Sequence, residues 1–231
     1  ALGEHPKEHP RRPEPAALGP PYRVGLRLLP QGSQAPLSVS VEHALNYYDA
    51  RGRTWERQAY VKARVAAGDR ALGEFFLAHL TPWIYTRYLS LADIAGIKGL
   101  KRRIERAAET AGVAERDVKT GRGGIRDIEF VIQFLQLLSG GALPSVRTGN
   151  TLQAIGRLEQ AGCLTPQERS LLEENYRFLR NVEPRLQVMF DLQTHEIPAD
   201  PAEQQKLARR LGFADDGKTT AGERLMADAH E

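Results

Sequence analysis

The feature that most constrains the fold is the stretch at residues 124–139, which follows a Gly-rich turn and consists mainly of Ile, Val, Phe and Leu. Four of its polar side chains form one stripe at helical spacing. A helix of this composition must be buried among other elements, because its apolar sides have to be removed from water. The sequence therefore predicts a helical domain around this segment, and 231 residues suffice for one large domain or two small ones.

Composition and charge narrow the class of protein. Hydrophobic residues are 41% of the chain and charged residues 26%, which is typical of soluble globular proteins. A net charge of +3 suits an anionic ligand but is too small to indicate a nucleic-acid partner. No apolar run approaches the roughly 20 residues of a membrane span, and no signal peptide is visible. A single cysteine, Cys163, excludes an intramolecular disulfide framework, so we expect a cytoplasmic protein.

The residue composition and hydropathy pattern change twice within the N-terminal third of the chain. Residues 1–21 contain six prolines among charged residues, and we expect this segment to be disordered. Apolar and polar residues alternate over 22–29 and 37–41, on either side of a Pro-Gly-Ser turn, which predicts a β-hairpin over 22–42. A helix follows at about 42–50, and 60–66 is compatible with a third strand. Residues 22–68 are therefore interpreted as a small α/β segment.

From Asp69 onward the pattern is helical. Asp69 is a candidate N-cap for a helix to about 79, Pro82 suggests a new start, and Asp93 is a candidate cap for a helix that ends at Gly112. Further helices are predicted over 124–139, 151–161 and 165–192, the last with a capping signature in Thr165, Pro166 and Glu168. We predict a mainly α fold with a small α/β part: a helical domain at 69–213 and a tail at 214–231 that includes a frayed helix.

Two basic features are candidates for binding phosphate. The Gly-rich turn before residue 125 opens a helix, and a helix N-terminus offers free N–H groups and a positive dipole end; Gly123, Gly124 and Arg126 are the candidates. Lys62 and Arg64 would point the same way from a strand. Each feature has a plainer interpretation, as a tight turn and as an exposed strand face.

The polar stripe of the apolar helix has a counterpart. Arg126, Glu129, Gln133 and Gln136 share one helix face, and the helix at 165–192 carries Arg180, Glu183, Gln187 and Asp191 at matching spacing. Opposite charges on the two helices predict an ion pair, either Arg126 with Glu183, which we expect, or Arg180 with Glu129. The stripes are either a buried structural network or the polar wall of a ligand cleft. His195 is interpreted as a capping or surface residue, and no histidine has metal-ligand spacing with another ligand.

Several long segments, in order, resemble one family. They are residues 22–69, 82–90, 119–141, which contain Gly-Arg-Gly-Gly-Ile-Arg-Asp-Ile-Glu-Phe, and 175–200, which end in Gln-Thr-His-Glu-Ile-Pro-Ala-Asp. Together they resemble the bifunctional glutamine synthetase adenylyltransferases, which have one adenylyl-adding and one adenylyl-removing half. The Gly-Gly-Ile-Arg-Asp-Ile-Glu-Phe and Gln-Thr-His segments are more similar to the N-terminal, removing half.

The resemblance implies the end of a nucleotidyltransferase sheet, followed by a helical bundle. It also implies ATP or ADP and Mg²⁺ as cofactors, and glutamine synthetase and a PII-type signalling protein as partners. The family holds Mg²⁺ with three carboxylates, two of them in a Gly-Ser…Asp-x-Asp motif that this sequence lacks. The family's third carboxylate position is Gly25 here, while Arg27 keeps the pattern and is a nucleotide-binding candidate. We therefore expect no intact catalytic or metal site in this chain.

Two other interpretations stay open at this point. One is a non-catalytic helical module that binds a nucleotide, a PII-type regulator or glutamine synthetase. The other is a PII uridylyltransferase-like protein, since that enzyme shares the helical domain type. The Trp-Glu-Arg-Gln and Gln-Thr-His stretches favour the adenylyltransferase family over the second alternative.

Overall fold

The computed structural model describes residues 28–31, 36, 38–85, 95, 99, 102, 116–190 and 194–230. The chain divides into two compact units, Ala1–Ser40 and Val41–Glu231. In the first, the described residues include a turn around Pro30, with Gln31 at a positive φ of 69°. The second unit is mainly helical, as predicted. Its described helices are α1 (Val41–Arg51), α2 (Thr54–Tyr60), α3 (Arg70–Ile84), α5 (Ile125–Ser139), the 3-10 helix η2 (Pro144–Val146), α6 (Thr151–Gln160), α7 (Pro166–Phe190), α8 (Pro201–Arg210) and α9 (Ala221–His230).

The helix starts follow the capping residues of the sequence. The Asp69 side chain accepts a hydrogen bond from the Leu72 N–H at 3.1 Å and begins α3. At the start of α7, the Glu168 N–H donates to the Thr165 hydroxyl while the Glu168 carboxylate accepts from the Thr165 N–H. This reciprocal pair satisfies backbone donors that the helix itself leaves free. Both predicted caps are confirmed.

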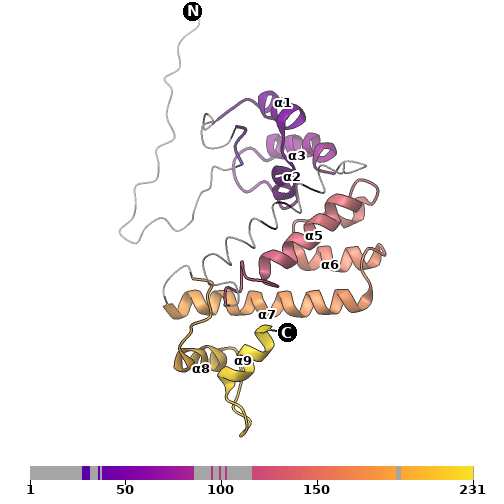
Figure 1. Cartoon of the computed structure of the whole chain (residues 1–231). Helices are drawn as coiled ribbons and strands as arrows, with labels where there is room; N and C mark the ends of the chain where they lie inside the picture. Colours follow the sequence, from indigo (N-terminus) through magenta and orange to yellow (C-terminus); the bar gives the residue numbers. More distant parts are fainter. Residues whose placement is uncertain are drawn as a thin grey trace, which may run out of the picture. The chain divides into compact units, whose positions relative to one another are not determined.

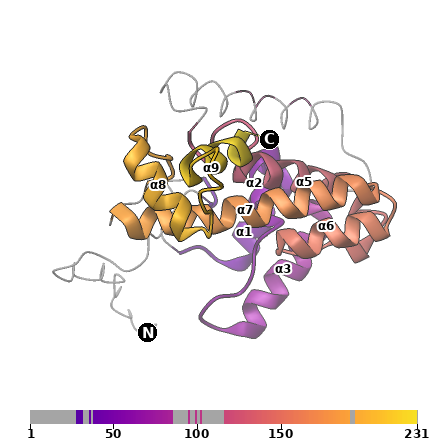
Figure 2. The ribbon, with the colours of Figure 1, turned by 90° about the horizontal axis from the view of Figure 1, so that it is seen from below.

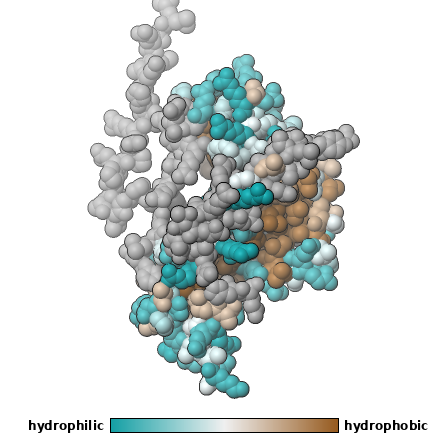
Figure 3. Space-filling view, viewed as in Figure 1, coloured by the Kyte–Doolittle hydropathy of each residue, from teal (hydrophilic) through white to brown (hydrophobic). Residues whose placement is uncertain are grey.

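Helix α5 lies between two apolar clusters, which explains its composition. Ile128 and Ile132 belong to the larger cluster, which α6, α7, α8 and α9 complete. Phe130 and Leu137 belong to the smaller cluster, with Tyr48 of α1 and residues of α3. The prediction that this segment is buried inside a helical domain is confirmed. Figure 3 shows an apolar area on the face along which α5 runs, and the helix has two exposed large apolar side chains, Val131 and Leu138.

The 25-residue helix α7 connects the two halves of the larger cluster. It packs against α5 and α6 on one side and against α8 on the other (Figure 1), and α9 packs on α8. Figure 2 shows the same arrangement from below, with α8 and α9 along α7. Ala221 and Leu225 of α9 are fully buried and belong to the larger cluster. No described helix has the length and apolarity to span a membrane.

Two local expectations were wrong. Residues 60–66 do not form a strand: Tyr60 ends α2, Val61 caps it in helical conformation, and 63–66 are irregular. The carboxylate of Glu56, buried at the start of α2, accepts from the Arg53 N–H at 2.7 Å and favours helix over strand. Pro82 does not start a new helix either. It lies inside α3, near the end, where the burial of Leu80 and Ile84 stabilises the last turn.

The predicted hairpin lies mostly outside the described residues, and Val41, its last expected strand residue, is the first residue of α1. The described residues contain no strand, only an isolated antiparallel bridge between Asp117 and Glu196. The helix predicted at 93–112 and the disordered segment at 1–21 also lie outside them, apart from residues 95, 99 and 102. The boundaries at 21, 68 and 213 stay predictions.

Candidate functional site

The Gly-rich turn before α5 is closed by the chain itself. The Gly123 N–H donates to the Asp127 carboxylate at 3.1 Å, and the Gly124 N–H to the Gly121 carbonyl at 3.0 Å. The N–H groups of the next two residues, Ile125 and Arg126, donate to carbonyls of residues 118 and 119, both at 2.9 Å. The first N–H groups of this helix, which a bare N-terminus would offer to an anion, are thus already used.

Gly123 and Gly124 are each explained by a different structural requirement of the turn. Gly124 is buried, and a Cβ there would lie 2.9 Å from the carbonyl oxygens of Gly121 and Val118. Gly123 has a positive φ of 73°, which side chains other than glycine rarely adopt. A role for Gly123 and Gly124 in binding phosphate stays a prediction, with the tight-turn interpretation beside it.

Arg126 lies on the outside of the same helix start. Its side chain is exposed, and the predicted ion pair with Glu183 is not formed. The predicted pair does not form because the first turn of α5 lies at the edge of the bundle, where Ile125 and Ile128 turn inward and Arg126 faces outward. Arg126 still acts on the site at longer range, since its charge contributes to lowering the pKa of His195.

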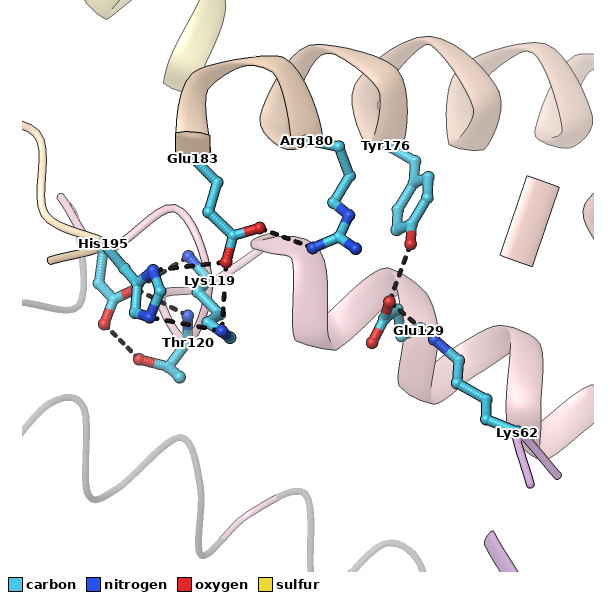
Figure 4. A network of polar contacts seen from close by, with 9 residues as sticks. Lys62, Lys119, Thr120, Glu129, Tyr176, Arg180, Glu183 and His195 are labelled. Atoms are coloured by element: carbon cyan, nitrogen blue, oxygen red, sulfur yellow. Dashed lines mark hydrogen bonds and ion pairs between the residues drawn. The ribbon is translucent and has the colours of Figure 1, made fainter. Parts of the chain in front are cut away.

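The Glu183 carboxylate is surrounded by basic side chains (Figure 4), and these residues are called the Glu183 cluster below. Its side chain is only 9% exposed; one oxygen lies 2.6 Å from Arg180 Nη1, and the other lies 3.1 Å from Lys119 Nζ and 3.4 Å from His195 Nδ1. Burial alone raises the pKa of the Glu183 carboxyl, but Lys119 and Arg180 outweigh it and hold that pKa below its usual value. The carboxylate is therefore ionised and compensated.

His195 is more enclosed than the sequence indicated. Its backbone carbonyl accepts from the Val118 N–H at 2.9 Å, and its Nε2 lies 3.3 Å from Lys119 Nζ. Burial and the ammonium of Lys119 lower the pKa of the His195 imidazole, although Glu183 acts in the opposite direction. His195 is thus part of the Glu183 cluster rather than a surface residue.

Glu129 joins α5 to the segment after α2 and to α7. Its Oε1 lies 2.7 Å from Lys62 Nζ, which follows α2, and accepts a hydrogen bond from the Tyr176 hydroxyl of α7 at 2.8 Å. Burial raises the pKa of the Tyr176 phenol, and the nearby Glu129 adds to this, while a hydrogen bond with Thr151 lowers it. The phenol consequently serves as a donor to the carboxylate.

These residues border an open groove of about 680 Å³. It lies between α5, the start of α6 and the middle of α7, with the segment after α2 on one side. Three of the side chains are cationic, Lys62, Arg177 and Arg180, and one is acidic, Glu129. The other lining residues are Gly149, Asn150, Thr151, Leu152, Tyr176 and Asn181.

The structure brings together only part of the predicted site. Lys62, Glu129 and Arg180 meet at the groove, and Glu183 is bound to Arg180 beside it. Arg64 is exposed and outside the groove lining, and Gln187 is half-buried on α7. Gly25 and Arg27 lie outside the described residues. Glu129 contacts α7 through Tyr176, and Arg180 and Glu183 pair with each other on α7, so the partners differ from those expected.

Several residues that the sequence analysis did not single out contribute to the cluster and the groove. They include Lys119, Thr151, Tyr176 and Arg177. Arg177 and Arg180 are three residues apart on one helix, a spacing that places two cations on one face. That signal was available, but Lys119 and Thr151 come from loop and helix-start positions whose proximity only packing reveals.

The part of the chain that the structure describes offers no donor set that fits the Mg²⁺ implied by the family resemblance. Across the described ranges, no group of three or more His, Cys, Asp or Glu side chains suits a metal ion. Glu129 and Glu183 each have cationic partners already.

Comparison with known proteins decides the family. A family model described as GlnD PII-uridylyltransferase matches residues 95–231, and one described as Glutamate-ammonia ligase adenylyltransferase matches residues 13–79. A protein of Brucella suis named bifunctional glutamine synthetase adenylyltransferase/adenylyl-removing enzyme is 43% identical over 196 residues, or 84% of this chain and 20% of its own length. The chain belongs to the glutamine synthetase adenylyltransferase family. Its helical part matches the domain type that the uridylyltransferase model describes.

Other members of the adenylyltransferase family give the same result. Proteins of that name from Agrobacterium fabrum and Stenotrophomonas maltophilia are 45% and 44% identical, over 87% and 84% of this chain. Each match covers 21% of the relative's own length. The chain thus spans about a fifth of the adenylyltransferase relatives it matches.

Proposed function

We propose that this chain is a segment of an enzyme that controls glutamine synthetase by adenylyl transfer to, or phosphorolytic removal from, a tyrosine. The observation that carries the proposal is the 43–45% identity, over 84–87% of the chain, to relatives whose names state that bifunctional activity. The Gly-Gly-Ile-Arg-Asp-Ile-Glu-Phe and Gln-Thr-His segments support assignment to the N-terminal, adenylyl-removing half. Glutamine synthetase is the proposed partner, and a PII-type protein the proposed regulator.

Residues 22–68 are the proposed C-terminal part of a nucleotidyltransferase-like domain, and residues 69–213 are the proposed helical domain. Lys62, just after α2, lies 2.7 Å from Glu129 of α5, so the first helices are joined to the bundle by a polar contact as well as by the smaller apolar cluster. This contact supports a fixed arrangement of the groove, which a bound ligand requires.

Two assays test the proposal. The chain alone should neither adenylylate glutamine synthetase with ATP and Mg²⁺ nor release ADP from the adenylylated form with phosphate, because it lacks the Asp-x-Asp motif and has Gly25 at the third carboxylate position. Turnover above a protein-free blank would contradict that incompleteness.

The second assay tests the family role. Residues 41–231 would replace the matching segment of the Brucella suis relative, and both reactions would be measured. Adenylyl removal should be retained if the segment is a working helical part of that half. A chimera that folds, with native-like circular dichroism and a cooperative thermal transition, but has lost removal would overturn the proposal.

A further inference from the structure

Three cationic side chains and one acidic side chain line the groove between α5, α6 and α7, and the carboxylate partners of Arg177 and Arg180 lie outside that lining. The Glu129 carboxylate already has Lys62 and Tyr176 as partners, at 2.7 and 2.8 Å. Arg177 is 64% exposed, and its contact with Glu173 is long, at 3.9 Å. The Arg177 guanidinium is therefore available to a ligand, because an exposed pair at that distance contributes little.

Arg180 adds a second guanidinium one turn along α7. Its Nη1 is bound to Glu183 at 2.6 Å, and its centre lies 5.9 Å from the Tyr176 ring, between the two acidic residues. These contacts fix the orientation of the guanidinium, and a guanidinium has five N–H donors, more than the Glu183 contact uses. A pre-oriented guanidinium loses less entropy when it binds an anion.

The start of α6 provides donors from another direction. The Asn150 side chain accepts from the Gln153 N–H at 3.0 Å, and the Ala154 N–H donates to the Asn150 carbonyl at 2.9 Å. Thr151 and Leu152 come before Gln153 and Ala154 in the first turn of α6. At these positions the helix itself has no carbonyl one turn earlier to accept a hydrogen bond from the backbone N–H. Both residues line the groove, so the positive end of the α6 dipole adds to the arginines.

We propose that this groove binds a phosphate group, as a phosphomonoester or as inorganic phosphate, through Arg177, Arg180 and the first turn of α6. A tetrahedral anion suits donors that come from several elements, whereas a carboxylate offers two oxygens in one plane. A volume of about 680 Å³ leaves room for a group attached to the phosphate, in the size range of small-molecule sites. The proposed function enters this proposal at one point only: it suggests that the phosphate comes from an adenylyl group or is free phosphate.

The test is a binding titration of the full chain with inorganic phosphate, AMP and succinate at constant ionic strength, followed by calorimetry and by ³¹P NMR for the two phosphates. Saturable binding of phosphate or AMP is expected, with succinate at least several-fold weaker. Arg177→Ala should weaken binding roughly tenfold, the loss of one charge-assisted contact. Arg177→Gln is a second variant that keeps a polar side chain, and circular dichroism checks that both variants fold.

Arg209→Ala is the matched control. Arg209 is 65% exposed and has one long ion pair, 3.4 Å from Asp215, but lies on α8 outside the groove lining. Its substitution should leave binding unchanged. Tighter binding of AMP than of phosphate identifies a phosphomonoester ligand, and equal binding identifies free phosphate.

The site is refuted by no saturable binding, by equal binding of succinate, or by equal weakening in Arg209→Ala. Glutamine synthetase and ATP are not present in this experiment. Its failure would therefore leave the proposed function standing, and loss of adenylyl removal in the chimera would leave the phosphate site standing.

Discussion

Lys62 Nζ lies 2.7 Å from Oε1 of Glu129 and thereby joins the segment after α2 to the central helix of the bundle. The two side chains are 33% and 24% exposed, so the pair is only partly shielded from water. Partial shielding makes the interaction stronger than a surface pair without the full desolvation penalty of a buried one.

The first prediction is that Lys62 and Glu129 are energetically coupled. In a double-mutant cycle of Lys62→Met and Glu129→Gln, urea unfolding should give a coupling free energy of about 1 kcal/mol. The comparison pair is Lys206 and Glu203 on α8, which are 2.6 Å apart but 62% and 31% exposed. That pair should show a coupling below about 0.5 kcal/mol, since screening is greater there. Simple additivity at Lys62 and Glu129 would show that the contact does not stabilise the fold.

A second prediction separates three glycines by their surroundings. Gly124→Ala should reduce the free energy of unfolding by about 1–3 kcal/mol, because the new Cβ would meet two carbonyl oxygens at 2.9 Å. Gly123→Ala should cost about 1 kcal/mol from its positive φ alone, since its Cβ would have no neighbour within 4 Å. Gly156→Ala, inside α6 and equally open, should stabilise by about 0.5–1 kcal/mol. Thermal and urea denaturation measure all three, and a stabilising Gly124→Ala would contradict the packing described.

Gln136 provides a third test. Its side chain is 2% exposed, and its Nε2 donates to the carbonyls of Val146 and Thr148, at 2.8 and 2.9 Å. Gln136→Leu would leave both carbonyls without this donor, so we expect a loss of about 1–3 kcal/mol in unfolding free energy. Gln133→Leu, one turn earlier and half-exposed, is the control and should stay within about 0.5 kcal/mol. Equal effects of the two substitutions would show that the buried hydrogen bonds contribute nothing measurable.

The fourth prediction concerns pH. The pKa of His195 is lowered in the folded protein, by burial first and by Lys119 second. The unfolded chain therefore binds the proton more readily near the usual histidine pKa of about 6.5, and stability should fall as pH drops below that value. The decline should continue until the pH reaches the lowered folded-state pKa of His195.

His195→Gln should flatten this part of the curve of unfolding free energy against pH, measured by urea denaturation from pH 5 to 8. The Glu183 contribution lies in a lower window: its lowered pKa gives stability above about pH 4.5 that is lost as the pH falls through the folded-state value. A curve that is flat in wild type between pH 5 and 6.5 would contradict the assignment to His195.

Much of the helical structure could be predicted from the sequence. The apolar composition of 124–139, the Asp69 cap and the Thr165–Glu168 capping box each depend on residues within one or two turns, and each prediction was confirmed. The two polar stripes also identified residues that meet, since Glu129, Arg180 and Glu183 all line or adjoin the groove. Helical spacing alone carried that information.

Tertiary structure decided which charges pair and where a groove forms. Arg126 and Lys119 have similar charges and lie close in the sequence, yet only Lys119 reaches Glu183, because the turn before α5 folds back on the bridge between Asp117 and Glu196. Lys62 was expected on a strand and instead follows a short helix that packing against α3 and α5 holds in place. Helix periodicity determines which face of a helix a residue occupies. Which other element packs against that face depends on contacts between segments far apart in the sequence, and local sequence patterns do not encode those contacts.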